Sequence, residues 1–118
     1  MKGAYLNLAT FKRNGDAVET PMWFVTIDHL IYLFTDGTSY KVKRLRRDNR
    51  IRIAPCNVSG KVSGDWVDGS GEIIDDPAVA ERVYAALKQK YGWQMRLLDL
   101  VSTLGRRIGG RAIIALKV

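Results

Sequence analysis

Residues 35–56 read TDGTSYKVKRLRRDNRIRIAPC, and this stretch is the most informative part of the chain. It starts with small and hydroxylated residues, continues into a short basic segment and ends in an apolar run typical of a strand. Seven lysines and arginines lie between residues 41 and 52 against one acid, Asp48, so the segment carries +6 in a chain whose total is +7. Hydroxyls, backbone N–H groups and lysines at a helix start bind anions, most often phosphate. The stretch therefore predicts strand, basic helix and strand, with a phosphate held at the helix start.

The segments on either side of this stretch indicate β-structure. Asn14-Gly15 predicts a hairpin turn and Asp28-His29 a second tight turn. Pro21 lies inside an expected strand and removes a ladder donor, so it marks an edge, a bulge or a place where a ligand takes over. Strands are expected at residues 5–11, 17–27, 30–35, 51–58, 65–74 and 111–118.

The spacing of apolar residues changes to a helical period after residue 74. Asp76 is expected to cap, and Pro77 to open, a helix that ends at Gly92. An apolar stripe over residues 97–104 predicts a further helix. Six strands and three helices predict a mainly β fold with accessory helices, a small six-stranded antiparallel barrel. Residues 1–118 are expected to form a single domain.

The composition narrows the class of protein. No apolar run approaches the roughly 20 residues of a membrane span, and no secretory signal is recognised, so a cytoplasmic protein without a membrane segment is expected. A single cysteine excludes an internal disulfide. The sequence pI of about 9.8 favours polyanionic partners.

Four segments of the chain carry a resemblance to a known family: TFKRNGDAVETPMWFV, LIYLFT, TSYKVKRLRRDNRIRIAPC and SGKVSGDWVDGSGEI. Together they resemble the pyridoxamine 5′-phosphate oxidase-like superfamily, and within it are most similar to the small deazaflavin-dependent oxidoreductases. The resemblance implies an FMN-binding-like split β-barrel that forms a homodimer with two cofactors between the protomers. It also implies an enzyme that transfers hydride between coenzyme F420, a deazaflavin, and a small organic substrate. FMN is the alternative cofactor, and a flavin or tetrapyrrole carrier is the alternative function.

The same resemblance implies three groups of cofactor-binding residues. The second strand would pass beside the cofactor ring at Thr20, Pro21, Met22 and Trp23. The cofactor phosphate would be bound by Thr35, Ser39 and Lys41, and Lys43 would lie within reach of it. The far side of the pocket would be lined by Ala54, Pro55 and Cys56. Catalytic residues stay unassigned.

Two features of the basic segment are open to interpretation. Asp48-Asn49-Arg50 stands where such relatives commonly have Asn-Pro-Arg, so the start of the fourth strand is expected to differ slightly. Three interpretations stay open for the arginines of the segment, which solvate the surface, pair with Asp75, Asp76 or Glu81, or attract a polyanionic tail; these arginines are Arg46, Arg47, Arg50 and Arg52. The oligoglutamate tail of a deazaflavin is such a polyanion, which leans towards coenzyme F420.

The remaining chemistry-bearing residues favour structural roles. Trp23, Trp66 and Trp93 are core candidates, and Cys56 is expected to be a small buried hydrophobe. His29, the only histidine, lies in a predicted turn, so neither a metal set nor a Ser/His/Asp arrangement is expected. An enzyme built on this chain therefore relies on a cofactor for its chemistry, and the product proton comes from water or a nearby Tyr or Lys.

A second class of function fits the charge as well. Small barrels bind single-stranded nucleic acid with basic grooves and stacked aromatic rings. Apart from Tyr40, the aromatic residues are not interleaved with the basic segment in the sequence, which counts against this alternative.

Overall fold

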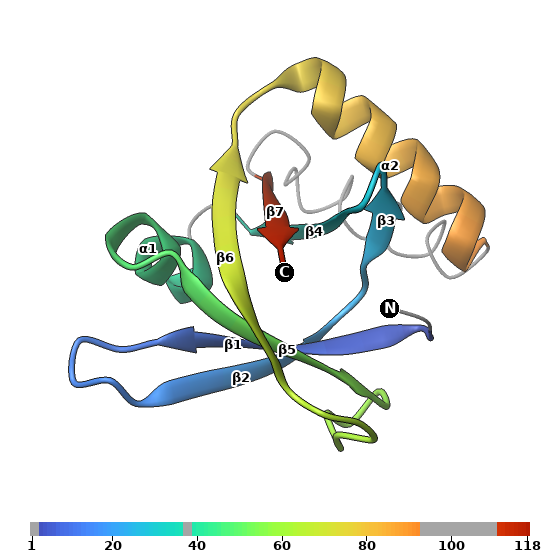
Figure 1. Ribbon diagram of the computed structural model, residues 1–118. Coiled ribbons are helices and arrows are strands. Elements are labelled where there is room, and N and C mark those ends of the chain that lie inside the picture. The colour runs from blue at the N-terminus through green and yellow to red at the C-terminus, as the bar shows by residue number, and fades with distance from the viewer. Residues whose placement is uncertain (1–2, 37–38, 93–110) are drawn as a thin grey trace.

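The computed structural model describes residues 3–36, 39–92 and 111–118, which form one antiparallel sheet and two helices (Figure 1). The sheet has seven strands in the order β2-β1-β5-β6-β7-β4-β3. In chain order the elements are β1 (Tyr5–Phe11), β2 (Ala17–Met22), β3 (Val25–Ile27), β4 (Leu30–Asp36), α1 (Tyr40–Arg47), β5 (Arg50–Cys56), β6 (Val67–Ile74), α2 (Pro77–Tyr91) and β7 (Arg111–Lys117).

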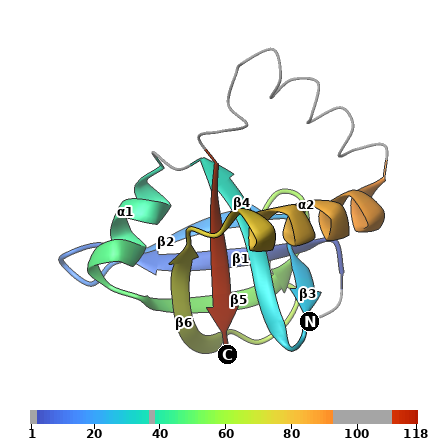
Figure 2. The same cartoon turned by 90° about the horizontal axis from the view of Figure 1, so that it is seen from above.

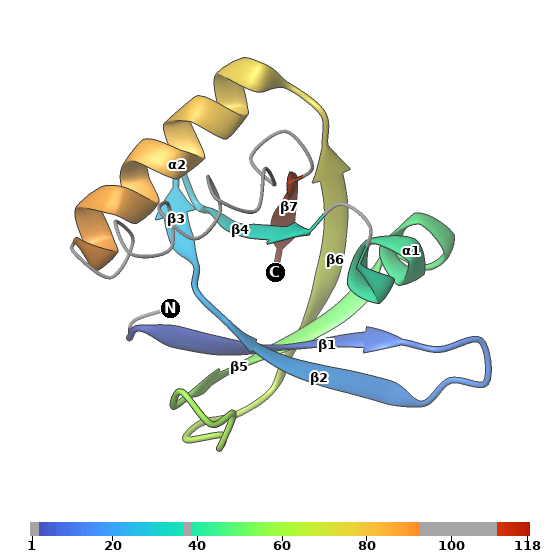
Figure 3. The ribbon, with the colours of Figure 1, turned by 180° about the vertical axis from the view of Figure 1, so that it is seen from behind.

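The sheet curls into a split β-barrel, which confirms the expected fold class. Strands β1, β2 and β5 form one side, β3, β4 and β7 form the other, and β6 crosses between them (Figures 1 and 3). The edge strands β2 and β3 follow each other in the chain but do not pair. Apolar side chains from both sides fill the interior: Leu6, Leu8, Met22, Phe24, Ile31, Leu33, Leu45, Ile51, Ile53, Ile114 and Leu116.

The strand count is seven rather than six because the strand predicted at residues 17–27 is interrupted. β2 ends at Met22 and β3 begins at Val25. Between them, the Phe24 N–H donates to the Tyr91 hydroxyl at 3.0 Å, and the Phe24 carbonyl accepts from Lys90 Nζ at 2.9 Å. These partners lie on α2 and replace strand pairing at this position.

The edge interpretation of Pro21 is confirmed. Pro21 pairs with Asn7 on one side, and β2 has no strand neighbour on its other side in the described sheet. A missing N–H is therefore tolerated at this position. The two predicted turns are present, with φ +91° at Gly15, and φ +50° at Asp28 and +70° at His29.

Both helices begin at a side-chain cap, of which Asp76 was predicted. The Ser39 hydroxyl accepts from the Val42 N–H at the start of α1, and the Asp76 carboxylate accepts from the Ala78 N–H at the start of α2. α2 ends at Tyr91, is capped by Gly92, and lies across β3 and β4 (Figures 1 and 2). None of the described helices is long and apolar enough to cross a membrane. The helix predicted at residues 97–104 lies outside the described residues, as does Trp93.

Two expected features need correction. Trp66 is not a core residue, because 37% of its surface is exposed. The strand predicted at residues 51–58 ends at Cys56. There the Asn57 side chain accepts the N–H groups of Ser59 and Lys61 and turns the chain.

Candidate functional site

The predicted phosphate-binding residues lie around the junction of β4 and α1. Thr35 and Ser39 are half-buried, and the Ser39 hydroxyl accepts from the Val42 N–H at 3.4 Å. Lys41 is half-buried in the first turn of α1, whereas Lys43 is exposed with its Nζ 5.2 Å from the centre of the Tyr40 ring. The junction therefore offers hydroxyls and lysines at a helix start, the donor set that suits a phosphate.

The predicted ring group on β2 and the predicted far-side group on β5 lie in the same side of the barrel, with β1 between them. The register pairs Pro21 with Asn7, and Asn7 with Ala54. Ala54 is fully buried, and Asn7 is 3% exposed. The Asn7 amide donates to the Gly60 carbonyl at 3.0 Å, while its Oδ1 is buried with no partner among the residues that the structure describes. The structure thus brings β2 and β5 together through a buried amide that the sequence analysis missed.

Asn7 had a signal in the sequence. It is the one amide in the strand YLNLATF, between Leu6 and Leu8, both of which are fully buried. A buried amide needs partners from outside its own strand, because the strand's backbone groups pair with the ladder. Its carboxamide therefore indicated a contact with a distant segment, but the sequence did not identify that segment.

The neighbouring positions face different surroundings. Met22 and Leu6 pair and belong to the barrel core, and Pro55 pairs with Leu6 on the other side. Thr20 is half-buried. Cys56 is also half-buried, at the end of β5, and burial raises the pKa of its thiol.

Trp23 lies apart from the other ring-contact residues. Its indole stacks on the Tyr91 ring with centroids 4.4 Å apart and planes inclined by 12°. It packs with the cluster beneath α2 rather than inside the barrel, where Met22 and Phe24 lie. At the break between β2 and β3, Met22 and Phe24 therefore point into the barrel core, and Trp23 packs against α2.

The ring and phosphate groups border the same break in the barrel wall. β3 pairs only with Leu30–Tyr32 of β4, so β4 runs on past the end of β3 towards α1. β2 is the opposite edge of the sheet. Figures 1 and 3 show β2, β3, β4 and α1 in turn around this side of the barrel. Met22 and Ser39 thus lie on different borders of one unpaired region.

A basic pocket lies beside this region, between α1 and the β1–β2 hairpin. Its volume is about 510 Å³. Its lining consists of five cationic residues and one tyrosine, without a carboxylate: Lys12, Arg13, Tyr40, Lys43, Arg44 and Arg47. Arg44 donates to the Thr10 hydroxyl at 3.3 Å, and Arg47 donates to the Phe11 carbonyl. Because these two contacts are to neutral oxygens, the charge of the pocket is not compensated within it.

Two other arginines have acidic partners. Arg50 pairs with Asp48 and Arg52 with Asp68, each at 2.8 Å. Of the three interpretations of Arg50 and Arg52, the pairing with Asp75, Asp76 or Glu81 is therefore wrong. Arg44 and Arg47 thus lie in a pocket without an acid, Arg50 and Arg52 are paired with acids, and the exposed Arg46 belongs to neither set.

Asp48 explains the start of β5. Its carboxylate accepts from the backbone N–H of Arg50 at 3.1 Å and from the Arg50 guanidinium at 2.8–3.2 Å. These hydrogen bonds lower the pKa of Asp48 to about 2. The acid thus turns the chain into β5 at the position where relatives were expected to carry a proline-containing sequence.

We expect Asp48→Asn to lower the midpoint of thermal unfolding at neutral pH, but not near pH 2. A folded pKa below the ordinary 3.8 contributes stability that is present above that value and is lost as the pH falls towards 2. The difference between wild type and variant should therefore close between about pH 4 and pH 2. Thermal melts across this range measure it, with Glu81→Gln on α2 as a control of equal charge change. A difference that is constant with pH would contradict the assignment.

The comparisons with known proteins agree with this geometry. The family model for pyridoxamine 5′-phosphate oxidase matches residues 4–118. No curated protein matches the chain.

Several solved structures share the fold. A conserved hypothetical protein of Mycobacterium tuberculosis is 25% identical with a TM-score of 0.72, and the match covers 96% of this chain and 71% of that one. A protein of the pyridoxinephosphate oxidase family from Clostridium acetobutylicum, related to general stress protein 26, is 20% identical with a TM-score of 0.70 and coverages of 98% and 75%. The heme storage protein HutZ of Vibrio cholerae is 12% identical with a TM-score of 0.70 and coverages of 97% and 80%.

Proposed function

Since this chain belongs to the pyridoxamine 5′-phosphate oxidase family, we propose that it is a cofactor-dependent oxidoreductase with a deazaflavin, coenzyme F420, as its cofactor. The substrate would be a small organic molecule that exchanges hydride with the cofactor. The observation that carries this proposal is the basic pocket of about 510 Å³ on α1, next to the helix start that bears Ser39 and Lys41. Such a place suits the phosphate and the anionic tail of a cofactor.

The residues on both borders fit the two parts of such a cofactor. Ser39 and Lys41 would hold the phosphate, and Thr35 lies at the same end of β4. β2 ends at Met22 on the opposite border, and its outer backbone edge would flank the ring. When bound, the cofactor supplies hydride chemistry, and the chain contributes binding and orientation.

The basic pocket supports a deazaflavin over FMN. Both cofactors carry a phosphate, so the β4–α1 junction does not distinguish them. The deazaflavin also carries an oligoglutamate tail, and the pocket next to α1 presents five cationic residues with no carboxylate among its lining residues. An anionic tail would compensate a charge that the protein leaves uncompensated there.

A haem carrier is the first alternative, because two similar structures are haem proteins by name. These are HutZ and a heme binding protein from Mycobacterium smegmatis, which is 15% identical with a TM-score of 0.66. Haem iron is commonly held by a histidine. The single histidine, His29, lies in the exposed β3–β4 turn, at the opposite end of β4 from Ser39. This placement favours the deazaflavin.

Nucleic-acid binding is the alternative of another class, and one contact favours it. The Phe11 ring lies 5.2 Å from the Arg50 guanidinium and 6.0 Å from that of Arg52. The fold thus places a second aromatic ring, besides Tyr40, among the cations. Both arginines have acidic partners, however, which reduces the charge available for a phosphate chain.

Titration of the purified protein with the deazaflavin, FMN and haem, followed by absorbance, tests the function. We expect saturable spectral change with the deazaflavin at the lowest concentration. A haem Soret band with an unchanged deazaflavin spectrum would make the chain a haem carrier. Spectra unchanged by all three ligands would contradict the cofactor proposal altogether.

We further propose that the active form is a homodimer. Val58 is 68%, Trp66 37% and Val67 45% exposed, and all three lie in or beside the connection from β5 to β6. Their exposure supports an interaction surface at this connection. We expect light scattering to give twice the 13.3 kDa of one chain at micromolar concentration. A mass of one chain at that concentration would contradict the dimer. Val67→Glu should shift the equilibrium from the dimer towards the monomer.

A further inference from the structure

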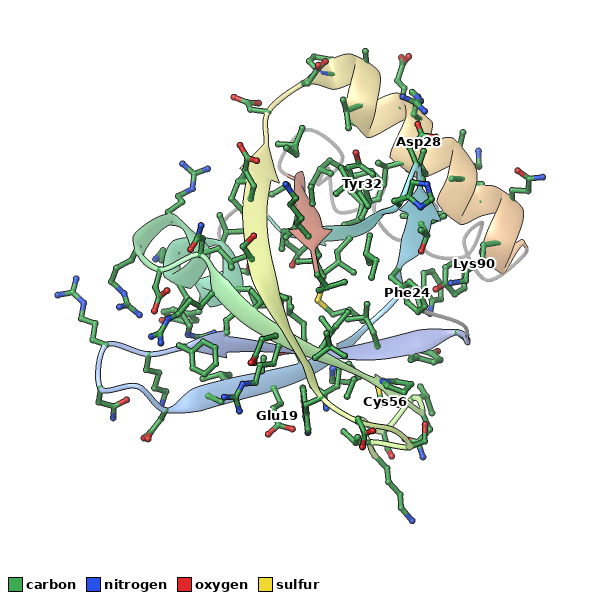
Figure 4. The ribbon with its side chains drawn as sticks, viewed as in Figure 1. Glu19, Phe24, Asp28, Tyr32, Cys56 and Lys90 are labelled. Carbon is green, nitrogen blue, oxygen red and sulfur yellow. The ribbon has the colours of Figure 1, made fainter. Side chains whose placement is uncertain are left out.

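The last turn of α2 reaches back to the junction of β2 and β3. The Tyr91 hydroxyl accepts the Phe24 N–H at 3.0 Å and lies 3.0 Å from the Phe24 carbonyl, which also accepts from Lys90 Nζ at 2.9 Å. Lys90 Nζ also lies 3.5 Å from the centre of the Phe24 ring, and Figure 4 shows the two residues side by side. Both backbone groups of Phe24 are therefore held by side chains that lie 66 and 67 positions further along the chain.

The Tyr91 contacts with Phe24 are buried and would be costly to lose, whereas Lys90 is exposed and its hydrogen bond to the Phe24 carbonyl is part-buried. Phe24 is 1% exposed and Tyr91 8%. Burial raises the pKa of Tyr91 to about 12, so its hydroxyl keeps its proton at neutral pH, and burial lowers the pKa of Lys90. Tyr91 also donates to the Ala4 carbonyl at 2.8 Å. Because the backbone of Phe24 has left the strand ladder, an unpaired N–H or carbonyl there would be left without a partner in the interior.

The side chains on either side of this peptide make the junction rigid. Phe24 packs in the barrel core, and Trp23 stacks on the Tyr91 ring in the opposite direction. Tyr91 thus holds the junction through its ring and through its hydroxyl. The position of the Met22–Trp23 peptide, at the end of the edge strand β2, follows from these anchors.

We propose that Lys90 and Tyr91 are positioning residues for the cofactor ring. Their side chains hold the backbone N–H and carbonyl of Phe24. Phe24 in turn fixes the end of β2 that would border the ring. The proposal rests on the proposed function, since it needs a ring at that border. In this proposal the end of α2 sets the position of the cofactor ring, and the start of α1 would hold the phosphate.

Three variants on one helix test this inference. Tyr91→Phe keeps the stacking on Trp23 and removes the hydroxyl, and Lys90→Met keeps an apolar stem over the Phe24 ring and removes the ammonium. Lys88→Met is the matched control, because Lys88 lies in the same last turn with its Nζ 5.2 Å from the Tyr84 ring. Each is titrated with the deazaflavin and with FMN, and the absorbance and fluorescence of the bound ring are recorded beside a thermal melt.

We expect Tyr91→Phe to weaken the binding of both cofactors by about tenfold and to shift the absorbance spectrum of the bound ring. Lys90→Met should weaken binding by a smaller factor and shift the spectrum less. Lys88→Met should match the wild type. Ser39→Ala should lower affinity without changing the bound-ring spectrum, because it acts at the phosphate. These spectra distinguish a role in ring geometry from a role in stability alone.

Two results would overturn the inference in distinguishable ways. If Tyr91→Phe and Lys90→Met lower the melting temperature but leave affinity and bound spectra unchanged, the contacts serve stability and not ring position. If the wild type itself changes the spectrum of neither cofactor, the proposed function fails and the inference falls with it.

Discussion

Lys41→Ala is expected to weaken FMN binding by roughly 10- to 150-fold. A hydrogen bond to a charged group contributes about 1.5–3 kcal/mol, and each 1.4 kcal/mol corresponds to about a factor of ten in affinity. Lys41 lies half-buried in the first turn of α1, two residues after the cap at Ser39. At this place the ammonium and the helix start would act on one phosphate.

Arg47→Ala is the matched control, because it removes a cation from the same helix at its other end. Arg47 is exposed and donates to the Phe11 carbonyl. A solvated charge at a distance is screened to a few tenths of a kcal/mol, so FMN affinity should change by less than about twofold. Fluorescence titrations at one ionic strength compare the two variants. Equal losses would show that α1 acts only through its total charge and that there is no specific phosphate site.

Local signals in the sequence were sufficient for the parts of the fold that depend on neighbours in the chain. The caps at Ser39 and Asp76 act on N–H groups two or three residues away, so the starts of both helices could be predicted. Pro21 indicated an edge strand because the reason, a missing N–H, resides in the residue itself. The positive φ of Gly15 follows from the same kind of local rule.

The break at Phe24 could not be predicted, because its cause is distant. Apart from Pro21, nothing within residues 17–27 indicates a break, and the strand ends because Lys90 and Tyr91 supply the partners of the Phe24 backbone. The same holds for Asn7, whose place between Pro21 and Ala54 is a matter of strand register. The side chains that border the candidate site were foreseen by resemblance, but those that hold them in place were not.

The charges of the basic segment also divide into what could be predicted from the sequence and what could not. The count of arginines was visible in the sequence, and their partners were not. Asp48 lies two residues before Arg50, yet acids further along the chain were considered as partners. Arg52 finds Asp68 because β5 and β6 pair in a register that sets these two residues opposite each other. Only the structure separates these compensated arginines from the basic pocket.

The deazaflavin is expected to bind ten- to a hundredfold more tightly than FMN at low salt. The ring and the phosphate are common to both ligands, so their contributions should largely cancel in the comparison. The remaining difference is the oligoglutamate tail, which would meet the basic pocket beside α1. Surface ion pairs contribute up to about 1 kcal/mol each, so two or three of them yield one to two orders of magnitude.

Salt and one variant separate this tail effect from any difference in the rings. The Debye length falls from about 10 Å at 0.1 M salt to about 3 Å at 1 M, so the deazaflavin's advantage should shrink to a few-fold at high salt. Arg47→Ala, which should barely affect FMN, should weaken the deazaflavin several-fold at low salt, because the tail would lie against this side chain. Arg82→Ala, which removes an arginine of α2 that pairs with Asp28, should change neither titration. Equal affinities for the two cofactors at low salt would instead make FMN the natural ligand, since the basic pocket would then contribute nothing to the choice.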